Sequence, residues 1–324
     1  LGAEGLDQAS STIEVNLDYR ITLTSGLTDY GQGSRTVYTL LAAEMLGVAP
    51  ERINLLRPDT NTAIDSGPTV ASRTTVVGGN AVKIAAGNLA HTLNLAAANL
   101  LHCEIEQLVR VGESFIGPDE TPVSWEAVVD HARLMGLTLS MHGTWQAPPI
   151  EWHHHAGHGS PYFAYHFGAQ VAEVEVDPAT GKVAVTGIWA AHDVGKTIFP
   201  QGAYGQVYGG VAQGLGYALI EGVEYDNGYI QNLNFDQYLI PTAVDVPEIE
   251  AVLVEKPLSH GPFGAKNMAE PTMVPTAPAI LNAIAHALGR RIRDLPANLE
   301  RVALGHNLRQ PGSGEAAQRG LLTS

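Results

Sequence analysis

The stretch from Asn80 to Leu101 constrains the fold of this chain most, because it is long and rich in Ala and Leu. Both residues are strong helix formers, so the stretch predicts one long helix that other elements must cover. Ser34 and Ser124 are expected to cap the starts of two shorter helices, and glycines to end others. These shorter helices are expected at residues 35–46, 125–135, 205–219 and 277–288.

Strands are expected where apolar residues alternate or form short runs between turn residues. A hairpin is expected within residues 12–24, and a second strand pair at 169–176 and 183–190. Single strands are expected at residues 52–56 and 249–254. Because strands and helices do not alternate as regular βαβ units, the expected fold class is α+β and not a doubly wound sheet.

The segment 146–162 is rich in Pro, Gly and His, which predicts a boundary between two lobes. The expected domains are a first lobe, residues 1–148, and a second lobe, residues 149–311. Residues 312–324 are expected to form a C-terminal tail.

The formal net charge is −15 and no run of Lys and Arg occurs, which argues against a nucleic acid or an anionic membrane as partner. No apolar run approaches the roughly 18 residues of a spanning helix. The N-terminal residues lack the features of a signal peptide. Cys103 is the only cysteine, which favours a reducing, cytoplasmic location. An iron–sulfur cluster needs about four thiolates, so this chain cannot hold one by itself.

Common nucleotide-binding and nucleophile motifs are absent from the sequence. The glycines of 209-GGVAQGLG-216 therefore indicate close helix packing more than a nucleotide site. The histidines at 153–155 and His158 leave two interpretations open, a metal site or a solvated connection between lobes.

Glu270 lies in a run of small and apolar residues in which Lys266 is the only other charge. Such a carboxylate is either a surface group ahead of a helix or an acid/base group held away from water. Three segments present backbone N–H groups or short hydroxyls near expected helix starts: 31-GQGS-34, 66-SGPTVASRTT-75 and 264-GAKNMAE-270. Helix caps and turns explain each segment alone about as well. Together they predict a large, phosphate-bearing cofactor, because such groups bind anions.

Four ordered motifs resemble the molybdenum-binding C-terminal half of the molybdenum hydroxylases, the xanthine dehydrogenase and aldehyde oxidoreductase family. They are 29-DYGQGSRT-36, 65-DSGPTVASRTT-75, 205-GQVYGGVAQGLG-216 and 264-GAKNMAEP-271. The resemblance runs from near residue 10 to about residue 290. It implies the two-lobed molybdopterin-binding domain of that family. It also implies a molybdopterin cofactor with molybdenum, as the mononucleotide or the cytosine dinucleotide.

The resemblance implies that Glu270 is the general base beside the metal. A carboxylate poorly solvated in an apolar niche is a better proton acceptor, so Glu270 is expected to be shielded from water. The pterin alone would hold the metal. The residues implied to bind the cofactor are Gln32, Gly33, Ser34, Thr69, Ala71, Ser72, Arg73, Thr74, Gln206, Lys266 and Ala269.

The chain departs from the family pattern just before this glutamate. Asn267, Met268 and Ala269 stand where the family has Gly-x-Gly. If the third position needs a positive φ, Ala269 is expected to be strained there.

The resemblance implies an oxidative hydroxylase of a purine, a nicotinate-like N-heterocycle or an aldehyde, with water as the oxygen source. The extent is similar to the medium molybdopterin subunit of split members such as bacterial nicotinate dehydrogenase. A second molybdopterin subunit is then expected to complete the site. Iron–sulfur clusters, and FAD if a flavin subunit is present, are expected in partner chains. A same-fold reductase, a carbon monoxide oxidiser and a non-catalytic assembly subunit remain the alternatives.

Overall fold

The computed structural model describes residues 7–153 and 155–306, and its contacts divide the chain into two compact units. Unit 1 comprises Leu1–His166, Asp193–Ala203 and Glu255–Met268. Unit 2 comprises Phe167–His192, Tyr204–Val254 and Ala269–Ser324. The expected lobe boundary at residue 148 stays a prediction, and the expected tail, 312–324, lies outside the described residues.

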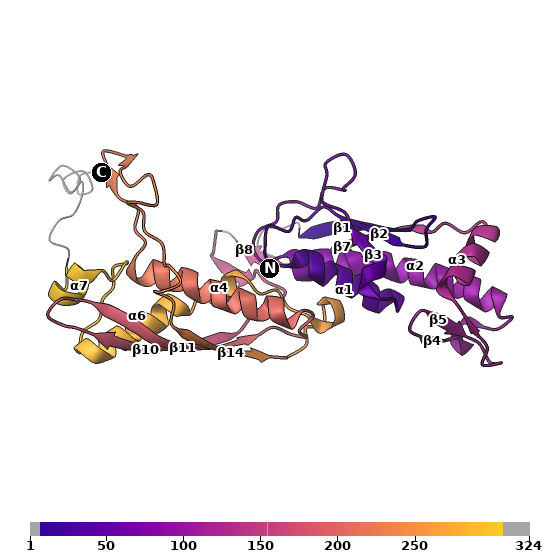
Figure 1. Ribbon diagram of the computed structural model, residues 1–324. Helices are drawn as coiled ribbons and strands as arrows, with labels where there is room; N and C mark the ends of the chain where they lie inside the picture. Colours follow the sequence, from indigo (N-terminus) through magenta and orange to yellow (C-terminus); the bar gives the residue numbers. More distant parts are fainter. Residues whose placement is uncertain (1–6, 154, 307–324) are drawn as a thin grey trace. The chain divides into compact units, whose positions relative to one another are not determined.

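Unit 1 is built on a four-stranded sheet in the order β3-β2-β1-β7 (Figure 1). Its strands are β1 (Gln8–Val15), β2 (Ile21–Ser25), β3 (Ile53–Leu55) and β7 (Ser140–Gln146). The expected hairpin is confirmed: β1 runs antiparallel to β2, with buried Ile13 opposite buried Leu23. β7 pairs antiparallel with the other side of β1. β7 was not predicted, because its apolar face is weak: Gly143 stands between Met141 and Trp145, although the burial of the strand does alternate.

Three helices of unit 1 are α1 (Ser34–Leu46), α2 (Gly79–Leu100) and α3 (Trp125–Leu134). α2, the predicted long helix, packs on β1, β7, α1 and α3. A Cβ at Gly143 of β7 would lie 2.4 Å from the Ala81 carbonyl oxygen, so only glycine lets β7 approach α2 this closely. The unit is completed by η1 (Pro50–Arg52), η2 (Thr74–Gly78), η3 (Ile105–Gln107), β4 (Val109–Val111), β5 (Ser114–Ile116), β6 (Pro122–Val123), β8 (Glu151–His153), β9 (His158–Ser160) and η4 (Pro262–Gly264).

The helix ends depart from the sequence expectation in two places. α4 (Pro200–Leu219) begins before the expected residue 205, and the start of α1 also differs. The Ser124 hydroxyl accepts the Ala127 amide and caps α3, as expected. Gly47 and Gly289 end their helices with φ of 63° and 69°. Ser34 was wrongly expected as a cap, because it is the first residue of α1 and Gly33, with φ 86°, precedes it. Glycine fits this left-handed position without steric cost.

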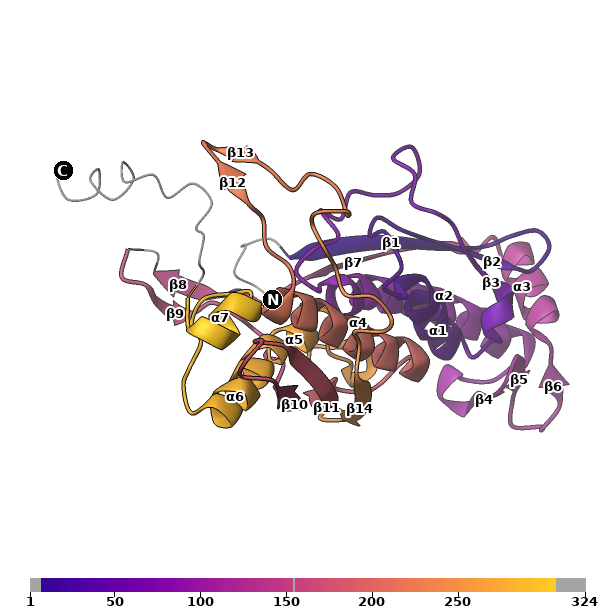
Figure 2. The ribbon, with the colours of Figure 1, turned by 60° about the vertical axis from the view of Figure 1, so that its left-hand side comes forward.

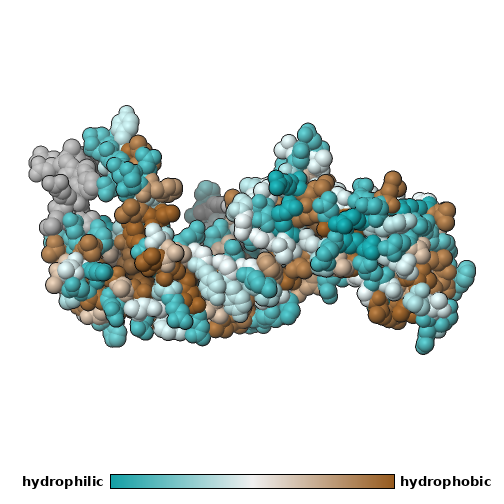
Figure 3. Space-filling model, in the orientation of Figure 1, coloured by the Kyte–Doolittle hydropathy of each residue, from teal (hydrophilic) through white to brown (hydrophobic). Residues whose placement is uncertain are grey.

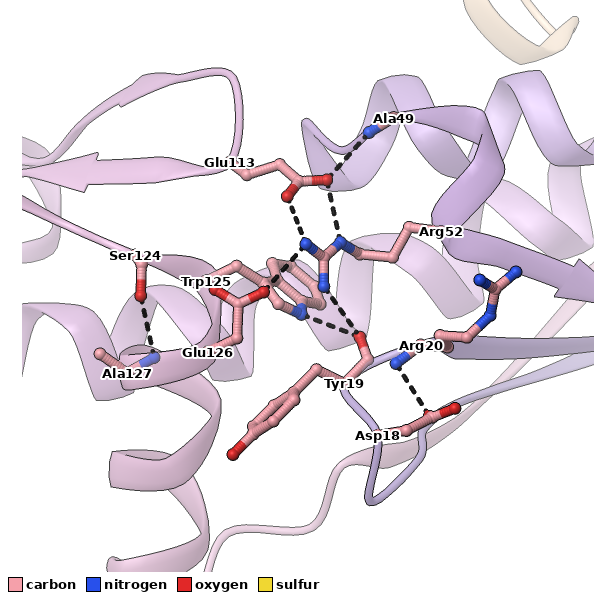
Figure 4. Close-up of polar contacts among 10 residues, drawn as sticks. All are labelled: Asp18, Tyr19, Arg20, Ala49, Arg52, Glu113, Ser124, Trp125, Glu126 and Ala127. Atoms are coloured by element: carbon pink, nitrogen blue, oxygen red, sulfur yellow. Dashed lines mark hydrogen bonds and ion pairs between the residues drawn. The ribbon is translucent and has the colours of Figure 1, made fainter.

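Arg52 ties together the parts of unit 1 that lie beyond its sheet (Figure 4). Its guanidinium donates to Glu113 at 2.5 and 2.9 Å and to Glu126 at 3.0 Å. A third nitrogen donates to the Tyr19 carbonyl, which also accepts the Trp125 indole N–H at 3.2 Å. The β1–β2 turn, η1, the β4–β5 turn and α3 are thereby joined at one residue.

Unit 2 contains a three-stranded sheet in the order β10-β11-β14 (Figure 2). The strands are β10 (Gly168–Val176), β11 (Val183–Asp193) and β14 (Glu248–Val254), and β10 pairs antiparallel with β11, as expected. α6 (Thr276–Leu288) packs on β10. The other elements are α4 (Pro200–Leu219), β12 (Tyr225–Asp226), β13 (Tyr229–Ile230), α5 (Glu270–Met273) and α7 (Leu299–Leu304). β11 and α4 each continue across the border between the units.

The glycines of α4 serve close packing, as the sequence indicated. A Cβ on Gly210 would lie 2.1 Å from Thr272 Oγ1 and 3.0 Å from the Met273 amide nitrogen. A Cβ on Gly214 would lie 2.4 Å from the Cβ of Thr276. Both threonines are fully buried, so they have no free space into which to move.

We predict that Gly210→Ala lowers the free energy of unfolding by about 1–3 kcal/mol, because the added methyl overpacks α4 against α5. Gly209→Ala is the matched control, since a Cβ there meets nothing within 4 Å. The control should raise the free energy of unfolding by about 0.5–1 kcal/mol through helix propensity alone. Urea denaturation of both variants measures the difference, and equal effects would contradict the packing.

Candidate functional site

The turn at residues 31–34 is organised by Asp29. Its two carboxylate oxygens accept the amides of Gly31 and Arg35, each at 2.8 Å. Burial would raise the pKa of Asp29, but these amides hold the pKa below its ordinary value. The glycine pattern had suggested that backbone amides of this turn bind a phosphate. The Gly31 and Arg35 amides are instead occupied by the carboxylate of Asp29 at the start of α1.

Gln32 folds back onto the same turn. Its side-chain nitrogen donates to the Thr28 carbonyl at 3.0 Å and to the Ser34 hydroxyl at 3.3 Å. Its side-chain oxygen accepts the Tyr30 amide at 2.8 Å. These contacts fix the shape of the turn, and the cofactor-binding roles of Gln32, Gly33 and Ser34 stay predictions.

Thr69 joins this turn to the second predicted segment. Its hydroxyl accepts the Thr28 amide at 2.9 Å, and its carbonyl accepts the Tyr30 hydroxyl at 3.3 Å. Two segments that lie about 40 residues apart in the sequence are thus side by side in unit 1.

Arg73 clamps the second segment to the sheet. Its Nη1 donates to the carbonyls of Ser66 and Pro68, at 2.6 and 3.0 Å. Its Nη2 donates to the Gln8 carbonyl at 2.7 Å, and its Nε to the Asp7 carboxylate at 3.0 Å. The side chain is only 4% exposed. Arg73 was predicted to bind the cofactor, but four of its five N–H donors hold the loop that bears the other predicted residues.

The backbone between Thr69 and Arg73 is bent sharply. Ala71 and Ser72 have φ of 53° and 51°, and each such non-glycine residue costs about 1–2 kcal/mol. The bend leads into η2, a π-helical turn continuous with α2, whose Thr74 carbonyl accepts the Tyr38 hydroxyl at 3.0 Å. Strained backbone and π-turns both concentrate at ligand-binding sites.

Lys266 belongs to a buried ion pair. Its Nζ lies 2.5 Å from the Asp193 carboxylate, and the two side chains are 10% and 8% exposed. Burial would raise the pKa of Asp193, but Lys266 and the Gly195 amide hold the pKa below its ordinary value. The Lys266 ammonium therefore supports the segment ahead of Glu270, and its predicted contact with the cofactor stays a prediction.

In unit 2, Thr272 brings the remaining predicted residues together. Its hydroxyl lies 3.0 Å from the Gln206 carbonyl and 2.7 Å from the Ala269 carbonyl. It thereby fixes α4 against the first turn of α5, which begins at Glu270. Ala269 has φ −155°, so the strain expected from a positive φ does not arise.

Glu270 itself is exposed, so the expectation that this chain shields it from water is wrong. The physical reason is the short helix α5. Residues two apart on a helix do not share a face. Thr272 is fully buried against α4 and Glu270 consequently faces outward. Any shielding of the carboxylate must come from beyond this first turn of α5.

The contacts of two key residues could not be predicted from the sequence. Asn267, which accepts the Val76 amide at 2.8 Å, and Thr272 act on partners 191 and 66 residues away. A sequence pattern within a few residues cannot predict contacts over such separations. Asp29 is different, because an Asp two residues before a Gly is a recognisable turn signal.

The clustered histidines supply no complete metal site in the part of the chain that the structure describes. His153 Nε2 lies 3.0 Å from the Glu151 carboxylate, and the His153 and His158 rings of the β8–β9 hairpin lie 4.9 Å apart, tilted by 57°. Within residues 7–153 and 155–306, no group of at least three His, Cys, Asp or Glu side chains is arranged to hold a metal ion. In the same residues, no helix is both long and apolar enough to cross a membrane.

We predict that Arg73→Ala lowers the free energy of unfolding by about 3–5 kcal/mol, because it removes a 4%-exposed cation that pairs with the 11%-exposed Asp7 carboxylate and donates to three carbonyls. Arg57→Ala, at an exposed position of the same loop, should change it by less than about 0.5 kcal/mol. Urea denaturation compares the two. Equal, small effects would show that the clamp is not structural.

A pH dependence is expected from His166. Burial lowers its pKa below the ordinary 6.5, assisted by the Lys266 charge and opposed by Asp193 and the Asn267 carbonyl. The unfolded chain therefore takes up a proton first, and stability falls as the pH drops below about 6.5 towards the folded-state pKa. Between pH 7.5 and 5.5 the melting temperature of the wild type should fall more than that of His166→Gln. A parallel decline would contradict this contribution.

A family model and individual relatives of this chain point to the same protein family. Residues 1–247 match the family model of the molybdopterin cofactor-binding domain. The aldehyde oxidoreductase of Megalodesulfovibrio gigas is 33% identical over 93% of this chain and 30% of its own length. The nicotine 6-hydroxylase large subunit of Paenarthrobacter nicotinovorans is 33% identical over 93% of this chain and 37% of its own length.

A solved structure agrees in fold. The quinoline 2-oxidoreductase of Pseudomonas putida 86 superimposes with a TM-score of 0.80 at 27% identity, over 91% of this chain and 38% of that one. The chain thus spans well under half of each of these proteins. The α+β fold and the molybdopterin cofactor with molybdenum, both predicted from the motifs, are confirmed, and the chain belongs to the molybdopterin cofactor-binding domain family of the molybdenum hydroxylases.

Proposed function

We propose that this chain is the molybdopterin-binding part of a molybdenum hydroxylase that oxidises an N-heterocycle or an aldehyde. The family match over residues 1–247 carries the proposal. The relatives' names support the substrate class, since they include an aldehyde oxidoreductase, a nicotine hydroxylase and a quinoline oxidoreductase. The overall reaction replaces a C–H bond of the substrate with C–OH, uses one water, and releases two electrons and two protons.

The residues of unit 1 fit an oxygen-rich cofactor. The strained bend at Ala71 and Ser72 leads directly into the start of a long helical stretch, where anions are stabilised. Asn267 also has a buried side-chain nitrogen without a hydrogen-bond partner within the described residues, as expected where a ligand supplies the acceptor. The Thr69, Ser72 and Thr74 hydroxyls of unit 1 would hold the cofactor. When bound, molybdenum supplies the capacity to take up two electrons.

Glu270 is proposed to accept a proton at its carboxylate during the reaction. Thr272 fixes the turn on which the carboxylate stands, and this rigidity favours proton transfer at a defined point. Because Glu270 is exposed in this chain, the substrate pocket around it is proposed to be completed by protein beyond these residues. We further propose that the assembly is cytoplasmic.

The arm of unit 2, residues 221–247, supports such a partner. Asn232 ties it internally, since its side chain donates to the Gly222 carbonyl at 2.7 Å and accepts the Glu224 amide at 3.0 Å. The arm nevertheless exposes large apolar side chains, including Val244 at 94% and Phe235 at 75% (Figure 3). It also carries five acidic residues and no basic one: Glu221, Glu224, Asp226, Asp236 and Asp245. A second molybdopterin-binding polypeptide with an apolar, basic-rimmed surface fits this arm. Iron–sulfur clusters, and FAD if present, are proposed to lie in further partner chains.

We predict that Glu270→Gln cuts turnover of the assembled enzyme by roughly 10²–10⁴ and leaves its molybdenum and pterin content unchanged. The assembly should be purified with its natural partners and assayed on quinoline-like, nicotinate-like and aldehyde substrates with an artificial electron acceptor. Glu250→Gln makes the same change of charge at an exposed position of β14 and should leave turnover unchanged. Full turnover of Glu270→Gln would exclude the proposed base.

A further inference from the structure

Asn267 lies three residues before Glu270 and makes hydrogen bonds with two segments that are distant in the sequence. The residue is 8% exposed. Its Oδ1 accepts the Val76 amide at 2.8 Å, and its backbone carbonyl accepts a hydrogen bond from His166 Nδ1 at 3.3 Å. The ring of His166 must therefore carry its proton on Nδ1, because a carbonyl can only accept.

The contact with Val76 closes the end of a long helical stretch. The first N–H groups of a helix have no partner within the helix and need one from elsewhere. η2 has no side-chain cap from its own neighbours, and α2 follows it without a break. Asn267 supplies the missing acceptor from 191 residues away. It thereby fastens the segment that leads to Glu270 to the helix start that follows the Ala71–Ser72 bend.

The other end of the same carboxamide is unsatisfied. Asn267 Nδ2 is buried and has no hydrogen-bond partner among the described residues. A buried donor without an acceptor is costly, so native proteins seldom leave one unless a ligand or water completes it. Oδ1 is held by Val76, so the carboxamide cannot simply turn to bring Nδ2 elsewhere without losing the cap.

We propose that Asn267 is a positioning residue of the cofactor site: its Oδ1 caps the helical stretch at Val76, and its Nδ2 donates to an oxygen atom of the bound pterin cofactor. The donor half of this inference rests on the proposed function. A glycine at position 267, as in the family pattern resembled by this segment, makes neither contact. The Asn at position 267 therefore joins the segment before Glu270 to the helical stretch at Val76, which a Gly at this position would not do.

Two variants separate the two ends of the side chain. Asn267→Ala removes both the acceptor and the donor. Asn267→Asp keeps an oxygen for the Val76 amide, since Asp is as good a helix cap as Asn, but it removes the donor. Asn88→Asp is the matched control on α2, because Asn88 is exposed and its Nδ2 donates to the His142 carbonyl.

The capping role is measured as hydrogen exchange at the Val76 amide in the full chain without cofactor. Exchange should be about tenfold faster in Asn267→Ala and near the wild-type rate in Asn267→Asp and Asn88→Asp. An unchanged rate in Asn267→Ala overturns the capping role. If Asn267→Ala does not fold, slow exchange in a folded Asn267→Asp supports the cap, and fast exchange there overturns it.

The donor role is measured as retention of pterin and molybdenum by the assembled protein during gel filtration. Asn267→Ala and Asn267→Asp should both release the cofactor about three- to tenfold faster than the wild type, and Asn88→Asp should not. Wild-type retention in Asn267→Asp overturns the donor role. A wild-type assembly that carries no pterin overturns the proposed function and the donor role together, whereas the Val76 exchange decides the capping role independently.

Discussion

The candidate site of unit 1 depends on one buried cation, the guanidinium of Arg73. A loop that runs from β3 to η2 has little apolar surface to bury, so its shape must come from directed hydrogen bonds. Arg73 provides them from within the loop, reaching back to the Ser66 and Pro68 carbonyls and across to the Gln8 carbonyl at the start of β1. A planar group with five fixed donors suits this task better than a flexible ammonium. The strained residues just before Arg73 can persist because this clamp determines the path of the chain on both sides.

A second set of contacts fixes the segment that precedes Glu270 in the sequence. The Arg73 loop leads into η2, Asn267 receives the Val76 amide, and Lys266 pairs with Asp193. In unit 2, Thr272 performs the analogous task between Gln206 and the first turn of α5. Several residues that were expected to bind the cofactor also hold neighbouring segments in place, and their contacts with the cofactor stay predictions. Arg73 and Lys266 are the clearest cases, since most of their polar atoms are already engaged within the protein.

Local chemistry made much of this structure predictable. The Ala- and Leu-rich helix α2, the Ser124 cap, the β1–β2 hairpin and the tight glycine packing of α4 all follow from patterns that lie within a few residues. β7 was missed because Gly143 interrupts the apolar face between Met141 and Trp145, which weakens the alternating pattern. The exposure of Glu270 was misjudged because a run of small, apolar neighbours in sequence does not place those neighbours around the side chain. Asn267 was noticed only as a departure from the family pattern. Its contact and that of Thr272 could not be predicted, because their partners are distant in the chain.

The proposed function depends on the relation between the exposed carboxylate of Glu270 and the molybdenum of the cofactor. The most direct measurement is an experimental structure of the assembled, cofactor-loaded protein, in which the surroundings of Glu270 can be seen. The account predicts that its carboxylate lies within hydrogen-bond reach, about 3 Å, of an atom bound to molybdenum, and that neighbouring protein shields it from bulk water. A carboxylate of Glu270 on the outer surface of that assembly, away from the pterin, would contradict it.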